Sequence, residues 1–104
     1  MPRAIANVQT TKPSPYLTQL CKHFSHQAGD DFSVQFDDLR GEMRYRSTRF
    51  GQQTILLDAS ADDLLVLTAV AETTDGLTDV ERWVGSHLER FGRRDQLEVK
   101  WLDS

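Results

Sequence analysis

The sequence holds few of the residues that disulfide frameworks, metal centres and membrane spans require. It has one cysteine in 104 residues, so no internal disulfide can form. No apolar run approaches the roughly 20 residues that cross a bilayer. No apolar segment follows the N-terminal Met1-Pro2-Arg3-Ala4 as it would in a secretory signal. We therefore expect a cytoplasmic protein without a membrane span.

An excess of positive charge is also lacking. The formal net charge is −4, from 12 Lys and Arg against 16 Asp and Glu. Proteins that bind nucleic acid or anionic lipid non-specifically need a dominant basic field. We expect the protein to bind neither, and any anion site to be local.

What is present is the composition of an ordinary globular protein. Apolar residues make up 38% of the sequence and charged residues 27%. A chain of this length buries one core and no second one. We predict a single domain over residues 1–104.

The first predicted helix follows a Pro-rich segment. Ser14 is expected as its N-cap and Pro15 as its first helical residue, because the missing N–H of proline would be unpaired there anyway. The helix should end near Gln27. Its apolar stripe is formed by Leu17, Leu20, Phe24 and Ala28. Cys21 lies on one margin of this stripe, and Tyr16 and His23 lie on the other.

The second predicted helix begins near Asp75, with Thr78 and Glu81 as an alternative capping box, and Gly92 closes it. Apolar residues recur along it every three or four positions, as they do on the buried face of a helix. These residues are Leu77, Val80, Val84, Leu88 and Phe91.

Strands are predicted between and around the helices. Apolar and polar residues alternate in 32–36, 42–46 and 97–101, and a short strand is expected over 4–10. Segments 53–57 and 64–70 are apolar on both faces, which is typical of central strands. The resulting order, β-α-β-β-β-β-α-β, predicts an α+β two-layer sandwich with both helices on one face of a mainly antiparallel sheet.

Motifs on both predicted helices carry a resemblance to a known family. They are Tyr16-Leu17, Gln19-Leu20-Cys21, His23-Phe24 and His26 on the first helix, His87-Leu88-Glu89-Arg90-Phe91 on the second, and Trp101 near the C-terminus. With them the chain resembles, over nearly its whole length, a bacterial family catalogued as domain of unknown function 2218. The resemblance implies a small stand-alone domain, similar in architecture to the TATA-box-binding protein class of folds. It also hints at iron utilisation, because members look as if they can occur beside flavin-dependent siderophore-interacting reductases.

The histidines suggest a metal site as one hypothesis. His23 and His26 lie three residues apart on one side of a helix, and His87 lies in the stripe of the other helix, so these three side chains could form one cluster. Cys21 and His23 cannot share an ion, because residues two apart on a helix are splayed by about 200°. The alternative is that His23 and His87 are boundary or buried histidines. We expect the alternative, with no metal and no cofactor.

A nucleophilic pair of Cys21 with His87 as its base is the second chemical hypothesis. Catalytic thiolates need an electropositive and accessible setting, often a helix N-terminus, whereas Cys21 falls in the middle of its helix. We therefore expect Cys21 to be a buried structural residue and the protein not to be an enzyme.

A surface for binding is predicted on the sheet face away from the helices. Arg44 and Arg46 should stand side by side there and could grip a carboxylate or phosphate, although a solvated strand face explains them equally well. Two helices cover only one face, so some apolar residues of the central strands must point outward, with Val66 at the centre. The set from which they come is Ile55, Leu57, Leu64, Val66 and Val70.

Three hypotheses follow in order of preference. The first is a non-enzymatic binding or accessory module that meets a protein partner or a small anionic ligand with Arg44, Arg46 and Val66. The second is a structural domain that forms a homodimer through the same open face. The third is an enzyme or metalloprotein that uses His23, His26 and His87.

Overall fold

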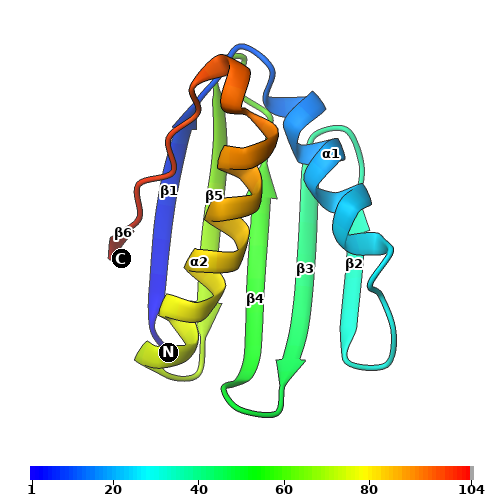
Figure 1. Cartoon of the computed structure of the whole chain (residues 1–104), viewed down its shortest axis with the longest axis vertical. Helices are drawn as coiled ribbons and strands as arrows, with labels where there is room; N and C mark the ends of the chain where they lie inside the picture. The colour runs from blue at the N-terminus through cyan, green and yellow to red at the C-terminus, as the bar shows by residue number, and fades with distance from the viewer. Residues whose placement is uncertain (104) are drawn as a thin grey trace.

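The computed structural model describes residues 1–103 and shows one six-stranded antiparallel sheet with both helices on the same face (Figure 1). The predicted α+β two-layer sandwich is confirmed. Neither helix in this described part is long and apolar enough to cross a membrane. The elements, in chain order, are β1 (Arg3–Gln9), α1 (Pro13–Ser25), β2 (Phe32–Phe36), β3 (Arg40–Ser47), β4 (Gly51–Asp58), β5 (Leu64–Ala71), α2 (Thr74–Phe91), a 3₁₀ turn η1 (Arg93–Asp95) and β6 (Leu102–Asp103).

The strands lie in the order β2-β3-β4-β5-β1-β6. The four strands between the two helices form a meander, and β1 closes against β5 with Ala6 opposite Leu67. This register decides which side chains face the helices, because successive residues of a strand point to opposite faces. Figure 1 shows α1 over the β2 and β3 side of the sheet and α2 over β4 and β5.

The core lies between this sheet face and the helices. Both apolar helix stripes face it, and burial of such apolar area is the main stabilising term in folding. On the sheet side the fully buried residues of the three central strands are Ala4, Ala6, Ile55, Leu65, Leu67, Ala69 and Ala71, with Val8 at the end of β1. On the helix side they are Leu17, Leu20, Cys21, Val80, Val84 and Leu88.

The helix ends differ from the prediction by one or two residues. Helix α1 starts at Pro13 with Lys12 as its N-cap, and Ser14 instead donates its hydroxyl to the carbonyl of Asp38, at 2.6 Å. The helix ends at Ser25, so Ala28 lies beyond it and is exposed.

Helix α2 starts at Thr74, close to the predicted Asp75, and is capped by Thr73 rather than by the alternative Thr78. The Thr73 hydroxyl accepts a hydrogen bond from the backbone N–H of Gly76, at 3.0 Å. This satisfies one of the N–H groups that the first turn of a helix leaves unpaired. Thr78 lies inside the helix and donates to the carbonyl of Thr74.

The predicted strand 97–101 is wrong. The chain pairs with β1 only at Leu102 and Asp103, opposite Ile5 and Ala4. Val99 and Trp101 pack beside Gly85 of α2, where an added Cβ would lie 3.3 Å from Trp101 Nε1. Alternation in this segment therefore reflects contact with a helix flank rather than pairing in the sheet.

Candidate functional site

An aromatic cluster lies where the end of α1, the edge of the sheet and the middle of α2 meet. Phe24 comes from α1, Phe32 from β2, Tyr45 from β3, and Trp83 and His87 from α2. Phe32 and Tyr45 are direct cross-strand partners. Trp83 and His87 are four residues apart, which places them on the same side of the helix.

The rings contact one another and form a continuous surface. Phe24 stacks on Phe32 with ring centroids 5.9 Å apart, and Trp83 meets the Phe24 ring edge-on at 5.1 Å. Phe32 also contacts Tyr45 at 5.5 Å and Trp83 at 6.0 Å. Offset and edge-to-face pairs at these separations are favourable, so the rings hold one another in place.

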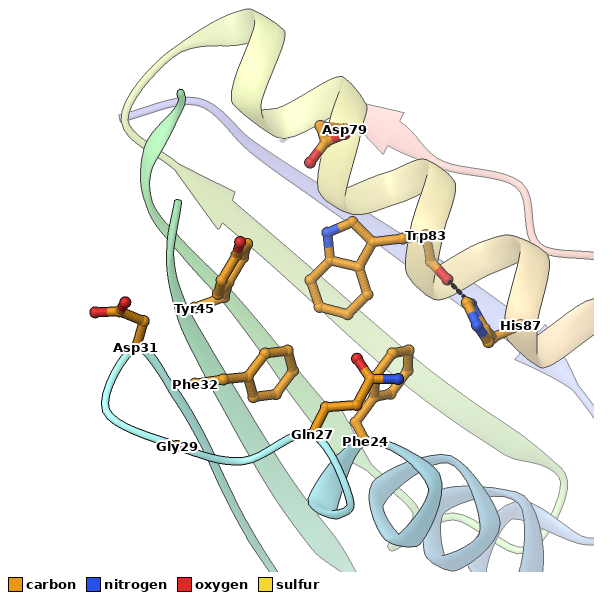
Figure 2. Close-up of a pocket in the computed structure, with 9 residues that line it drawn as sticks. All are labelled: Phe24, Gln27, Gly29, Asp31, Phe32, Tyr45, Asp79, Trp83 and His87. Atoms are coloured by element: carbon orange, nitrogen blue, oxygen red, sulfur yellow. Dashed lines mark hydrogen bonds between the residues drawn. The ribbon is translucent and has the colours of Figure 1, made fainter. Parts of the chain in front are cut away.

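This surface lines an open cleft of about 460 Å³, shown in Figure 2. In the figure, Trp83 and Tyr45 reach in from opposite sides, with Phe32 and Phe24 below them. The remaining lining residues are polar, or lack a side chain, and come from the loop after α1 and from α2; they are Gln27, Gly29, Asp31, Asp79 and His87. Volume and lining are those of a small-molecule site, with apolar walls and a few polar groups.

His87 is held at the inner end of the cleft by its own helix. Its Nδ1 donates a hydrogen bond to the carbonyl oxygen of Trp83, at 2.6 Å, as the dashed line in Figure 2 shows. Since a carbonyl can only accept, Nδ1 carries the proton, and in the neutral imidazole Nε2 is left as an acceptor.

His23 lies behind this cleft, packed among rings. Its ring centroid is 5.1 Å from that of His87 and 5.3 Å from that of Phe91. Burial lowers the pKa of His23 below its ordinary value of 6.5, and the neighbouring charges of His87, His26 and Arg90 lower this pKa further.

The three histidines of the metal hypothesis are not gathered into one site. His23 and His87 lie together, whereas His26 is exposed just beyond the end of α1. Within residues 1–103, no group of three or more His, Cys, Asp or Glu side chains is placed to hold a metal ion. The geometry lends the three-histidine site no support.

Cys21 is fully buried in the core, as predicted. Burial raises the pKa of its thiol to about 12. A thiol with this pKa is protonated at neutral pH and is neither a nucleophile nor a metal ligand. The chemistry of the site therefore lies in the aromatic cleft and not at the cysteine.

The opposite face of the sheet is not covered by any helix (Figure 1). Val66 lies on this face, half-buried, between Leu64 and Thr68 on its own strand, and Val70 follows beyond Thr68. Ile55 and Leu57 point to the core instead, and Leu56 between them is 42% exposed. The strand register thus divides the predicted apolar set between the two faces.

Arg44 and Arg46 lie side by side on this open face, on β3 next to the edge strand β2, and both are exposed. The Arg44 guanidinium is 3.3 Å from the Glu42 carboxylate on the same strand. A hollow elsewhere on this face is bordered by three carboxylates, those of Asp37, Glu42 and Asp58, and by one guanidinium, that of Arg40. The hollow therefore does not favour an anion.

Sequence reasoning did not identify the aromatic cleft. The signal that was available is the pairing of Trp83 with His87 at helical spacing on the margin of the buried stripe. Two large rings that each carry a polar nitrogen, placed beside the buried stripe, indicate a surface that could bind a ligand. What the spacing does not reveal is that Phe32 and Tyr45 lie across from them.

Comparison with known proteins gives a fold and a family. The solved structure of PA4090 from Pseudomonas aeruginosa, determined by NMR, is similar at 27% sequence identity and a TM-score of 0.74, over 98% of this chain and 96% of that one. No curated protein matches the sequence. The family described as "Uncharacterized protein conserved in bacteria" matches residues 5–102. Because this match spans nearly the whole sequence, the chain belongs to that family, DUF2218.

Proposed function

We propose that this protein is a non-enzymatic interaction module that self-associates through the open face of its sheet. The observation that carries the proposal is an apolar centre on that face, with Arg44 and Arg46 toward one end of the strands and the Asp58 carboxylate toward the other. Ile5, Leu56 and Thr68 form one cross-strand row at the centre, between Val66 on one side and Val70 on the other.

The charges on this face follow the strand direction. Glu42 lies in the central row itself, opposite Leu56, and the next row toward one end carries Asp58 and Arg40, which are 4.0 Å apart. The other end carries Arg3, Arg44 and Arg46, together with Glu72, which accepts a hydrogen bond from the backbone N–H of Gln52.

A second copy of the chain complements this arrangement. Turned about a two-fold axis that runs across the strands, its end with Arg44 and Arg46 faces the end of the first copy that carries Asp58, and the two apolar centres meet. Two-fold dimers use the same patch on both subunits, so such a patch must be self-complementary. Charge complementarity of this kind fixes the orientation in which two surfaces dock.

The face is large enough for a stable dimer. The molecule measures 36 × 28 × 22 Å, and the sheet spans the two longer dimensions. Such a face has an area on the order of 1,000 Å², compared with the about 800 Å² that each partner contributes to a standard interface.

Molecular mass in solution tests the proposal. We expect the parent protein to be a dimer by sedimentation equilibrium and Val66→Asp to be a monomer, because the new carboxylate would be buried unpaired in the interface. The control is Ser86→Asp, which adds the same charge on the exposed side of α2 and should stay dimeric. A monomeric parent, or a dimeric Val66→Asp, would refute the proposal.

A charge exchange tests the orientation of the dimer. Arg44→Glu reverses a charge at the basic end of the face, and Glu42→Lys reverses the charge of the carboxylate in the central row. We expect each variant alone to self-associate more weakly than the parent, and an equimolar mixture of the two to form heterodimers. Failure of the mixture to associate, with both variants folded, argues against the antiparallel arrangement.

The link with iron and siderophores that the family resemblance hints at is not part of this proposal. Within residues 1–103, no group of three or more His, Cys, Asp or Glu side chains is placed to hold a metal ion, so the described residues add no support to that link. The alternative is a binding module that holds an anionic ligand with Arg44 and Arg46. Because this alternative predicts a monomer, the molecular mass of the parent protein in solution distinguishes it from the dimer.

A further inference from the structure

The charged side chains that line the aromatic cleft are acidic, and one imidazole, that of His87, lines it as well. Asp31 and Asp79 are the two carboxylates, and no lysine or arginine lines the cleft. Figure 2 shows Asp79 on α2 beside the cleft and Asp31 beyond Tyr45, with its carboxylate directed away from the rings. An occupant of this cleft therefore meets aromatic faces and negative charge together.

Aromatic faces and carboxylates attract the same kind of ligand. The face of an aromatic ring carries partial negative charge, and Trp is the side chain that attracts a cation best, followed by Tyr and Phe. Tyr45, Trp83, Phe32 and Phe24 supply all three ring types around one space. A weakly hydrated organic cation gains from these rings and also buries apolar surface against them.

A buried acceptor next to the cleft remains unpaired. The Nε2 group of Gln53 donates to Asp79 Oδ2 at 3.0 Å and to the carbonyl of Gly76 at 2.9 Å, which fixes the orientation of the amide. Its Oε1 is the buried side-chain atom without a hydrogen-bond partner in the described residues 1–103. Gln53 lies directly across the strands from Tyr45, so this acceptor adds to the negative potential behind the rings.

We propose that the aromatic cleft binds a small organic cation, of the alkylammonium class, between the rings of Trp83, Tyr45 and Phe32, with the Asp79 carboxylate beside it and the Asp31 carboxylate at the rim. The cleft volume of about 460 Å³ exceeds that of a tetraalkylammonium head and leaves room for a short polar tail. The cleft lies on the helix side of the sheet, so this site does not depend on self-association through the other face.

Choline and 3,3-dimethyl-1-butanol form a matched pair of probes. The alcohol has the same shape but a carbon in place of the charged nitrogen, so the difference in affinity isolates the effect of charge. Binding is followed by NMR through the two indole N–H signals of Trp83 and Trp101. Trp101 packs on the other side of α2, beside Gly85, and serves as an internal control.

We expect choline to bind about tenfold more tightly than the alcohol and to shift the Trp83 signal but not that of Trp101. Asp31→Asn combined with Asp79→Asn should reduce the affinity for choline several-fold and leave that for the alcohol unchanged. Asparagine keeps an oxygen acceptor for Gln53, so this variant should stay folded. Trp83→Leu should weaken both probes.

The control for net charge is Asp62→Asn combined with Glu98→Gln, two exposed carboxylates outside the cleft, which should leave choline binding unaltered. Equal affinity for the two probes, an absence of choline binding, or equal losses in the two charge-neutralised variants would each overturn the proposal.

Discussion

Replacing Gly41 by alanine tests how closely α1 lies on the sheet. Gly41 is buried on β3, and a Cβ built on it would lie 2.9 Å from Cys21 Sγ. The next nearest atoms, Leu57 Cδ1 and Phe36 Cβ, would be at 3.4 Å, which is ordinary contact. The sulfur of Cys21 is therefore the one atom that must move.

Two opposing effects decide the sign of the change. Alanine restricts the unfolded chain more than glycine does, which stabilises the folded state by about 0.4–1 kcal/mol where the backbone conformation is compatible. Extra atoms forced into a packed core cost about 1–3 kcal/mol. Cys21 is 0% exposed and has no room to rotate away, so the second effect should win. We expect Gly41→Ala to lower the free energy of unfolding by about 1 kcal/mol.

A double-mutant cycle with Cys21→Ala makes this prediction specific. Cys21→Ala alone should cost only about 1 kcal/mol, as expected for the loss of a small buried group. In that background the sulfur is absent, so Gly41→Ala should be neutral or stabilising. The coupling energy should then exceed the roughly 0.5 kcal/mol within which independent mutations add.

Urea unfolding of the four proteins, followed by circular dichroism, gives these free energies. Equal m-values would show that the unfolding transition is the same in each. If Gly41→Ala costs the same with and without Cys21, the contact between α1 and β3 is not as close as the structure shows, and the reasoning fails.

Three further predictions concern titration and burial. The pKa of His23 is lowered in the folded state, mainly by burial and then by the neighbouring His87. The stabilisation from keeping His23 neutral should therefore be complete above pH 6.5, its ordinary pKa. The free energy of unfolding should fall as the pH drops from 6.5 toward the pKa of His23 in the folded protein. His23→Leu should flatten that pH dependence in urea titrations, and an unchanged slope would contradict it. The Tyr16 hydroxyl donates to Asp95, raising the pKa of Tyr16 to about 12 and lowering that of Asp95, so in Tyr16→Phe an NMR titration should find the pKa of Asp95 closer to its ordinary 3.8. Cys21 should react with thiol reagents only when the protein unfolds, and rapid labelling under native conditions would show that the helix-sheet packing is wrong.

The order of helices and strands could be predicted because each element carries a local signal. The stripe Leu17, Leu20 and Phe24 has helical spacing, and Phe32 and Val34 alternate with polar residues. The helix caps could be predicted only approximately, because Thr73 and Thr78 are equally suitable as caps by sequence. The structure selects Thr73, whose hydroxyl meets the N–H of Gly76.

The faces of the central strands could not be assigned from their own sequences. Segment 64–70 is apolar at odd and even positions alike, so both registers bury apolar residues. Its neighbour β1 decides the matter, because the small residues Ala4 and Ala6 are fully buried under the helices and pair with Ala69 and Leu67. Val66 is thereby turned outward.

The cleft depends on contacts between residues distant in sequence, which local patterns do not contain. Phe32 and Tyr45 become neighbours through the β2–β3 pairing, and Trp83 meets them only because α2 crosses the same end of the sheet. The alternation of Val99 and Trp101 with polar residues predicted a strand that the structure does not contain. It has the period of a strand, yet both side chains lie against α2.

The two candidate surfaces lie on opposite faces of one sheet, and this separation has a consequence for how the protein can work. Tyr45 points to the helix side and lines the cleft, while its neighbours Arg44 and Arg46 point to the open side. A dimer formed through the open faces leaves both clefts turned outward and accessible.

Strand β3 belongs to both surfaces, so ligand binding at Tyr45 and association through Arg44 act on the same eight residues. If the strand transmits strain between its two faces, choline should alter the dimer dissociation constant, and the dimer interface should alter choline affinity by the same factor. Sedimentation of the parent with and without choline measures the first of these effects, and choline titration of the parent and of monomeric Val66→Asp measures the second. Unequal factors would mean that Val66→Asp disturbs the cleft by another route.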